Sequence, residues 1–283
     1  MTQINDRGDW LQAVTTSLQA WRQGDFVLGE QWFVLRYNLQ KPITQEAIRD
    51  AQEGVDLTEI AVRGLVVVTQ TCDIVRSCED RPFVEVVPLV EVEAASLQEV
   101  QRGRRPQYAF IPGAAELSLV ADLDRVMTIE KAVVTEWERQ VGCISDQDFR
   151  NLGQALARKR VRFAFPDDFI EFIKPLQKQL QSKHGKNSPE GEALRSLQEI
   201  RVQASPAWDA VSMELMFWFI RNEEDLQFQG TSWNKLLEKW LRLVSAAGRF
   251  QRVEGVVTTL EDMTAKEYVQ SDRLDLDHLS IQS

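Results

Sequence analysis

A thiol, a carboxylate and three neutral hydrogen-bonding side chains follow one another directly after an apolar run of the sequence. The run Val66–Val68 leads into this group, which consists of Thr69, Gln70, Thr71, Cys72 and Asp73. We call residues 69–74 the elbow. Polar side chains at the end of a strand are well placed for binding or catalysis, because a rigid element holds them. In a functional interpretation Cys72 is a nucleophile or Asp73 holds a ligand, and the neutral side chains supply hydrogen bonds.

A structural interpretation of the elbow makes Cys72 a small buried hydrophobe and Asp73 a turn residue that binds nearby backbone amides. A free thiol with a pKa of about 8.5 is only a few per cent thiolate at neutral pH, so a nucleophilic cysteine needs an adjacent base or cation. The neighbouring Asp73 is an anion, and the two histidines, His184 and His278, lie far along the chain. We therefore expect Cys72 to be buried and structural.

Basic residues gather locally in a chain that is otherwise acidic. Lys and Arg number 33 against 43 Asp and Glu, a formal net charge of −10, which repels polyanions over most of the surface. A candidate polyanion contact consists of Arg158, Lys159, Arg160 and Arg162. These residues fall largely on a predicted helix, where a solvated basic face is the alternative interpretation. The net charge disfavours nucleic acid as a partner without ruling it out, and another protein is the expected partner.

The cysteines predict neither a disulfide framework nor a structural zinc site. There are three of them, Cys72, Cys78 and Cys143, which is an odd number. Structural zinc sites take four Cys or His ligands in paired short spacings, and the sequence does not supply that pattern. Reduced thiols are the expected state.

The acidic tail from Ser271 to His278 has two interpretations. Alternating carboxylates at Asp275 and Asp277 share one side of an extended chain and would chelate Mg²⁺ or Ca²⁺. In the simpler interpretation three leucines of the tail dock on the protein while the acids face water. These leucines are Leu274, Leu276 and Leu279. We expect docking rather than a metal site, and we expect no cofactor.

The sequence carries no sign of export or of a membrane span. Residues 1–10 are polar and acidic, whereas a signal peptide begins with a basic and then an apolar stretch. The longest apolar runs, Leu65–Val68 and Leu215–Ile220, are far shorter than the roughly 20 residues that cross a bilayer. We expect a cytoplasmic protein.

Short β-rich segments dominate the first half of the chain. A helix is expected over Asp9–Gln23, and residues 38–59 form a polar insertion with a short helix from Thr44. Branched and aromatic runs predict strands over Phe26–Leu35 with a break at Gly29, Val62–Thr69, Phe83–Val92, Tyr108–Ile111, Leu117–Ala121 and Val126–Val134. So many short strands usually close on themselves, which predicts a small barrel or sandwich.

The pattern changes to helices and fewer strands in the second half. Helices are expected over Asp146–Arg160, Phe165–Lys183 and Ser232–Ala246, and strands over Ile200–Ala204, Val211–Arg221 and Phe250–Leu260. The polar segment Ser182–Glu192 is expected to be an exposed turn. The chain is thus predicted to be α+β, with a β-rich domain at residues 1–142 and a mixed α/β domain with a ββαβ ending at residues 143–283.

Three segments of the first half resemble a known family. Gly24–Val27, Arg63–Val68 and Phe83–Leu89 look like the first strands of the SH3-like barrel of the PemK/MazF toxin family. The resemblance implies an SH3-like barrel before residue 142. Members of the family are endoribonucleases, and their arginine and threonine would fall on Arg63 and on the position of Val90. Valine lacks the hydroxyl of that threonine, so the resemblance supports the fold more than the activity.

No complete set of catalytic residues is visible, so the leading interpretation is a non-enzymatic binding or adaptor protein. Its candidate binding residues are Arg63 together with five residues of the elbow, namely Thr69, Gln70, Thr71, Cys72 and Asp73. The alternative is an enzyme, either a toxin-like endoribonuclease or a cysteine-dependent enzyme that uses the elbow. The family resemblance adds a place in a bacterial toxin–antitoxin or phage-defence system.

Overall fold

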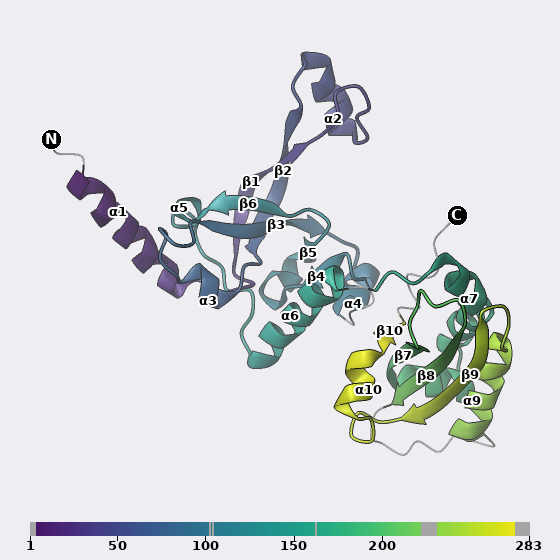
Figure 1. Cartoon of the computed structure of the whole chain (residues 1–283). Helices are drawn as coiled ribbons and strands as arrows, with labels where there is room; N and C mark the ends of the chain where they lie inside the picture. The colour runs from purple at the N-terminus through teal and green to yellow at the C-terminus, as the bar shows by residue number, and fades with distance from the viewer. Residues whose placement is uncertain (1–3, 102, 104, 162, 222–230, 275–283) are drawn as a thin grey trace. The chain divides into compact units, whose positions relative to one another are not determined.

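The computed structural model describes residues 4–101, 103, 105–161, 163–221 and 231–274. The fold is α+β, as the sequence predicted, and the chain divides after Val161 into two compact units (Figure 1). We call them unit 1 and unit 2. None of the helices in the described ranges has the length and apolar character needed to cross a membrane.

Unit 1 is built on an antiparallel sheet. Its strands are β1 (Phe26–Arg36), β2 (Leu57–Val67), β3 (Phe83–Glu91), β4 (Tyr108–Phe110), β5 (Leu119–Asp122) and β6 (Met127–Glu130). The order is β1-β2-β3-β5-β4, and β6 also pairs with β3. Strand β1 approaches β6 where the Val34 N–H donates to Met127 Sδ at 3.4 Å, but no ladder joins them in the described part. The SH3-like barrel is therefore not confirmed, because the sheet does not close.

Two apolar clusters cover the two faces of this sheet, since side chains alternate along a strand. One cluster contains Phe26, Val66 and Leu89 together with Leu152 of α6 (Asp146–Arg160). The opposite cluster holds Val27, Leu65, Val67, Val84 and Val86, and it is covered by α1 (Ile4–Ser17). Helix α6 thus belongs to unit 1, and the units divide at 161/162 rather than at the predicted 142/143.

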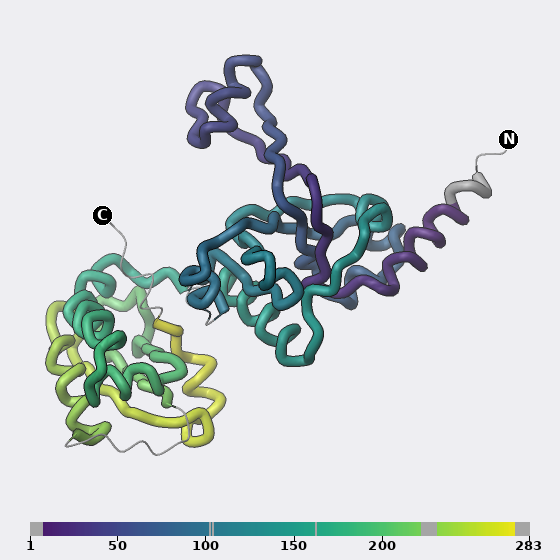
Figure 2. The backbone as a smooth tube through the Cα atoms, turned by 180° about the vertical axis from the view of Figure 1, so that it is seen from behind, coloured from purple at the N-terminus to yellow at the C-terminus, as the bar shows by residue number. Residues whose placement is uncertain are grey.

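The predicted insertion extends the β1–β2 hairpin beyond the rest of unit 1, as both ribbon and tube show (Figures 1 and 2). The register of β1 on β2 shifts between Leu28 and Gln31, around Gly29 at a φ of 104°, where the sequence predicted a break. Helix α2 (Gln45–Asp50) begins after Thr44, whose hydroxyl accepts the Ala47 N–H at 3.2 Å. The threonine cap explains why the predicted short helix forms there.

Unit 2 contains the predicted ββαβ series, but a further helix and strand that the sequence did not predict follow it. Its sheet contains β7 (Leu197–Ser205), β8 (Met213–Arg221), β9 (Phe250–Thr258) and β10 (Asp272–Arg273), in the order β10-β7-β8-β9. Strands β8 and β9 are parallel, and α9 (Trp233–Leu241) connects them. Helices α7 (Asp167–His184) and α9 pack on the sheet through Phe169, Ile173 and Trp240.

Two of the predicted segments have a different secondary structure from the one expected. The strand expected over Val126–Val134 ends at Glu130 and continues as helix α5 (Lys131–Val134). The expected exposed turn Ser182–Glu192 includes the start of α8 (Pro189–Ser196), where Glu190 is buried. The other short helices are η1 (Leu18–Ala20), η2 (Ala51–Glu53), α3 (Thr71–Ile74), α4 (Ala94–Gln101), η3 (Pro112–Leu117), η4 (Arg242–Val244) and α10 (Ala265–Gln270).

The tail docks on unit 2 as far as it is described. Leu274 is buried in the core of unit 2, and its N–H donates to Ile200 O at 2.8 Å. The other residues of the two tail interpretations lie outside the described residues, namely Asp275, Leu276, Asp277, His278 and Leu279.

Candidate functional site

The hydroxyls of the two elbow threonines bind backbone N–H groups of other segments of unit 1. Thr69 lies two residues after the end of β2, and its hydroxyl accepts the Glu85 N–H of β3 at 2.6 Å. The Thr71 hydroxyl accepts the Gln23 N–H at 3.0 Å. Both side chains therefore position the elbow against the rest of unit 1.

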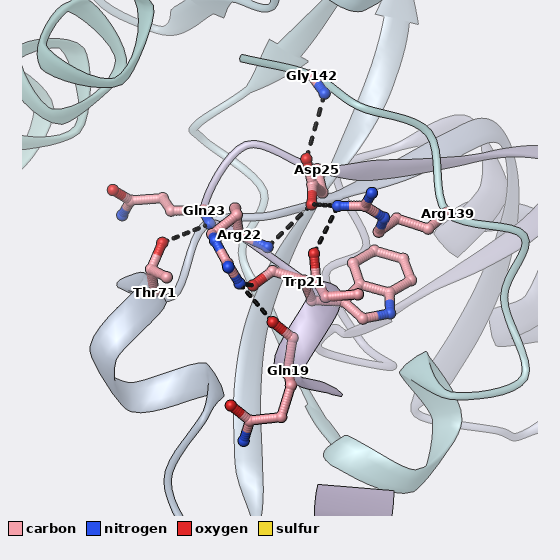
Figure 3. A network of polar contacts seen from close by, with 9 residues as sticks. Gln19, Trp21, Arg22, Gln23, Asp25, Thr71, Arg139 and Gly142 are labelled. Carbon is pink, nitrogen blue, oxygen red and sulfur yellow. Dashed lines mark hydrogen bonds and ion pairs between the residues drawn. The ribbon is translucent and has the colours of Figure 1, made fainter. Parts of the chain in front are cut away.

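A hydrogen-bond network around the buried carboxylate of Asp25 fixes the segment that Thr71 contacts (Figure 3). Asp25 is 1% exposed, and its carboxylate accepts from Arg139 Nη1 at 2.9 Å, from the Arg22 N–H at 2.9 Å and from the Gly142 N–H at 3.3 Å. Arg139 also donates to Ala20 O. The network ties residues 20–25 to residues 139–142, so the elbow rests on a rigid support.

The buried side chain of Lys131 binds the backbone of the elbow and of the residues that follow it. The sequence analysis did not identify this lysine. The side chain is 1% exposed, and Nζ donates to the backbone carbonyls of Asp73 and Arg76 at 2.8 Å each. Burial lowers the pKa of the Lys131 ammonium, which the nearby Cys78 and Asp73 partly oppose. The signal in the sequence was a lysine directly before the apolar residues 132–134. It was overlooked because this segment was assigned to a strand.

The expected burial of Cys72 is wrong, because the Cys72 side chain is exposed. Helix α3 is a single turn, and Ile74 is its buried residue. Residues two apart on a helix point away from each other, so the burial of Ile74 turns Cys72 outward. Cys72 Sγ lies 3.7 Å from Gln70 Oε1, and the Asp73 carboxylate lies 3.6 Å from Arg76 Nε. Neither contact supplies a base for the thiol.

Native-state labelling with a disulfide reagent such as DTNB is expected to modify Cys72 rapidly and the other two cysteines only after unfolding. Cys78 and Cys143 are 7% and 3% exposed, and burial raises the pKa of the Cys143 thiol to about 12. Cys72→Ser should remove the rapid phase, since the two remaining thiols are buried and inaccessible to the reagent. A rapid phase that persists in Cys72→Ser would place another thiol at the surface.

The elbow, the start of β3 and the end of α6 line a cleft of about 590 Å³ in unit 1. Its polar wall contains Thr69, Gln70, Asp73, Arg81, Glu85 and Arg160, and its apolar wall contains Phe83, Val84, Leu156 and Val161. We call this the elbow cleft. Arg160 Nη2 pairs with Glu85 Oε2 at 2.7 Å. The cleft therefore brings together two candidates that the sequence kept apart, the elbow and a member of the basic cluster.

The remaining members of the basic cluster do not share that cleft. Lys159 pairs with Asp124, and Arg158 does not line the cleft. Successive residues of a helix point in directions about 100° apart, so α6 spreads the three basic side chains over different surfaces. Arg162 lies outside the described residues.

Arg63 lines a different cavity, of about 770 Å³, in unit 1. Its guanidinium pairs with Glu91 at 3.1 Å, and Val90 and Arg125 line the same space. The two positions that the family resemblance singles out, Arg63 and Val90, thus share one cavity. Arg63 does not belong to the elbow cleft as the sequence had grouped it.

Compared with known proteins, the chain matches no family model and no curated sequence.

Proposed function

We propose that this chain is a non-enzymatic binding protein whose elbow cleft takes a segment of another protein. The observation that carries the proposal is an exposed cation beside an exposed aromatic ring. Arg81 forms no ion pair or side-chain hydrogen bond with any residue that the structure describes, and Phe83, two residues on, is 55% exposed. A segment that offers a carboxylate to Arg81 and an apolar side chain to Phe83 satisfies both.

The charges of the elbow cleft favour a protein segment over a nucleic acid. Asp73 and Glu85 line the cleft with the two arginines, and Glu85 already neutralises Arg160. A nucleic acid backbone needs several unpaired cations, whereas a peptide of mixed charge needs one. The net charge of −10 points the same way.

A binding role also accounts better for the elbow than a cysteine enzyme does. Within the described ranges the contacts of Cys72 include no base, and no three His, Cys, Asp or Glu side chains are grouped to hold a metal ion. The resemblance to PemK/MazF-like barrels supports a place in a bacterial toxin–antitoxin or antiviral defence system, with the partner met in the cytoplasm.

Peptides selected from a random display library on the full-length chain are expected to carry an acidic residue near an apolar one. Arg81→Gln and Phe83→Ala should each lower the affinity of the chain for the selected peptides about tenfold or more, because each removes one of the two anchoring side chains. Arg36→Gln is the matched control, since Arg36 is an exposed arginine that does not line the cleft and should leave affinity unchanged. Peptides without acidic residues, or peptides that bind both cleft variants normally, would refute the proposal.

A toxin-like endoribonuclease is the second candidate, favoured by the shared cavity of Arg63 and Val90. Val90 has no hydroxyl, and Glu91 pairs with Arg63 beside it. Cleavage of a panel of RNA oligonucleotides that Arg63→Ala abolishes would replace the binding proposal with this one.

A further inference from the structure

Unit 2 contains a cavity of about 370 Å³ between the start of α8 and helix α9. Three lysines line it, Lys183 from the end of α7 and Lys235 and Lys239 from α9. Its volume falls within the range of small-molecule sites, roughly 300–1,000 Å³. The cavity lies in a different unit from the elbow cleft and is independent of the proposed function.

One of the three lysines is neutralised by a buried carboxylate. Glu190 is 8% exposed and pairs with Lys239 Nζ at 2.7 Å. Its oxygens also accept from Gln179 Nε2 at 3.0 Å and from Trp240 Nε1 at 3.1 Å. The carboxylate is therefore fully engaged, and its charge is balanced within the protein.

The other two ammonium groups are left without a counter-charge. Lys183 and Lys235 form no side-chain hydrogen bond or ion pair with any part of the chain that the structure describes. Two like charges on one cavity repel each other, and an anion between them would remove that cost. The cavity thus has a net positive charge that the described side chains do not neutralise.

The segment from the end of α7 to the start of α8, which contributes Ser188 and Pro189 to the cavity, is held by its own hydrogen bonds. The Ser188 hydroxyl accepts the Gly191 N–H at 3.2 Å, and Arg195 Nη1 donates to His184 O at 2.7 Å and to Lys186 O at 3.0 Å. A Cβ on Gly191 would lie 2.2 Å from Lys186 O, so this close approach requires glycine. The first turn of α8 adds the partial positive charge of a helix N-terminus. A segment held in this way lowers the ordering cost of binding.

We propose that this cavity binds a small molecule through a phosphate group held between Lys183 and Lys235. A phosphate monoester carries about −1.5 to −2 charges at neutral pH and three strong acceptor oxygens, which suits two lysines and the Ser188 hydroxyl. A single carboxylate would leave one ammonium unmatched. The phosphate belongs either to an inorganic ion or to a nucleotide, and separate titrations distinguish these sources.

Isothermal titration of the full-length chain with pyrophosphate and with AMP tests the site. At least one of the two is expected to bind, and Lys183→Gln and Lys235→Gln should each weaken it about tenfold or more through loss of a charge-assisted contact. Tighter binding of pyrophosphate identifies an inorganic source, and tighter binding of AMP a nucleotide.

Lys178→Gln is the matched control, because Lys178 is an exposed lysine of α7 outside the cavity, and it should bind like the native chain. Lys235→Arg keeps the charge and should retain binding. The proposal is overturned if neither probe binds, or if Lys178→Gln weakens binding as much as the cavity variants. Circular dichroism of every variant separates loss of the site from loss of the fold.

Discussion

Replacing Asp25 by alanine is expected to destabilise unit 1 by about 3 kcal/mol, the lower end of the range for breaking a buried ion pair. The carboxylate is 1% exposed and accepts from Arg139 and from two backbone N–H groups. Alanine removes the acceptor of all three donors, and within the part of the chain that the structure describes only Arg139 keeps another one, Ala20 O. Arg139 keeps a third of its side chain exposed, at 33%, so water relieves part of that cost.

Hydrogen exchange read by mass spectrometry measures this effect within the intact chain. Peptides from β1 and β2 should exchange faster in Asp25→Ala, while peptides from unit 2 should be unchanged. Asp56→Ala is the matched control, because the Arg36–Asp56 pair is exposed and its loss should cost less than about 1 kcal/mol. Equal protection of β1 and β2 in Asp25→Ala and in the native chain would mean that the network does not stabilise unit 1.

Local patterns predicted most elements of the fold. The alternation in 26–28 and 65–68 places successive side chains in opposite clusters, and helix α6 covers the predicted range Asp146–Arg160. The predicted boundary between the units was wrong because the composition changes at residue 142, whereas Leu152 packs helix α6 into the core of unit 1. Likewise, whether strands close into a barrel depends on distant pairings, which no local pattern encodes.

Buried charges account for much of what sequence reasoning missed. Lys131 and Glu190 were assigned to an ordinary strand and an exposed turn, since charged residues are seldom buried without partners. Several of their partners lie about 50 or more residues away, at Asp73 for Lys131 and at Lys239 and Trp240 for Glu190, although Gln179, a further partner of Glu190, is 11 residues away. The elbow was found because its residues are adjacent, and Arg160 was found separately. That the two face one cleft depends on how α6 packs.

Ending the chain at Gln270 is expected to lower the unfolding free energy of unit 2 by roughly 2–5 kcal/mol, most of it from one buried leucine at about 1.5–3 kcal/mol. Leu274 is 3% exposed in the core of unit 2. Asp272 Oδ2 accepts from Trp208 Nε1 at 2.7 Å, and Ser271 Oγ accepts from Arg201 Nε at 2.9 Å. All these contacts, with the β10–β7 ladder, are lost together.

A chain that ends at Leu274 is the matched control for this truncation, because it keeps β10 and its buried leucine and differs by four residues. Thermal unfolding of the full chain and both truncations, with and without EDTA, separates docking from a metal site in the acidic tail. Docking predicts a clearly lower midpoint for the chain ending at Gln270, and no effect of EDTA on the full chain. If EDTA lowers the midpoint of the full chain to that of the chain ending at Gln270, Asp275 and Asp277 hold a metal ion and the docking account fails.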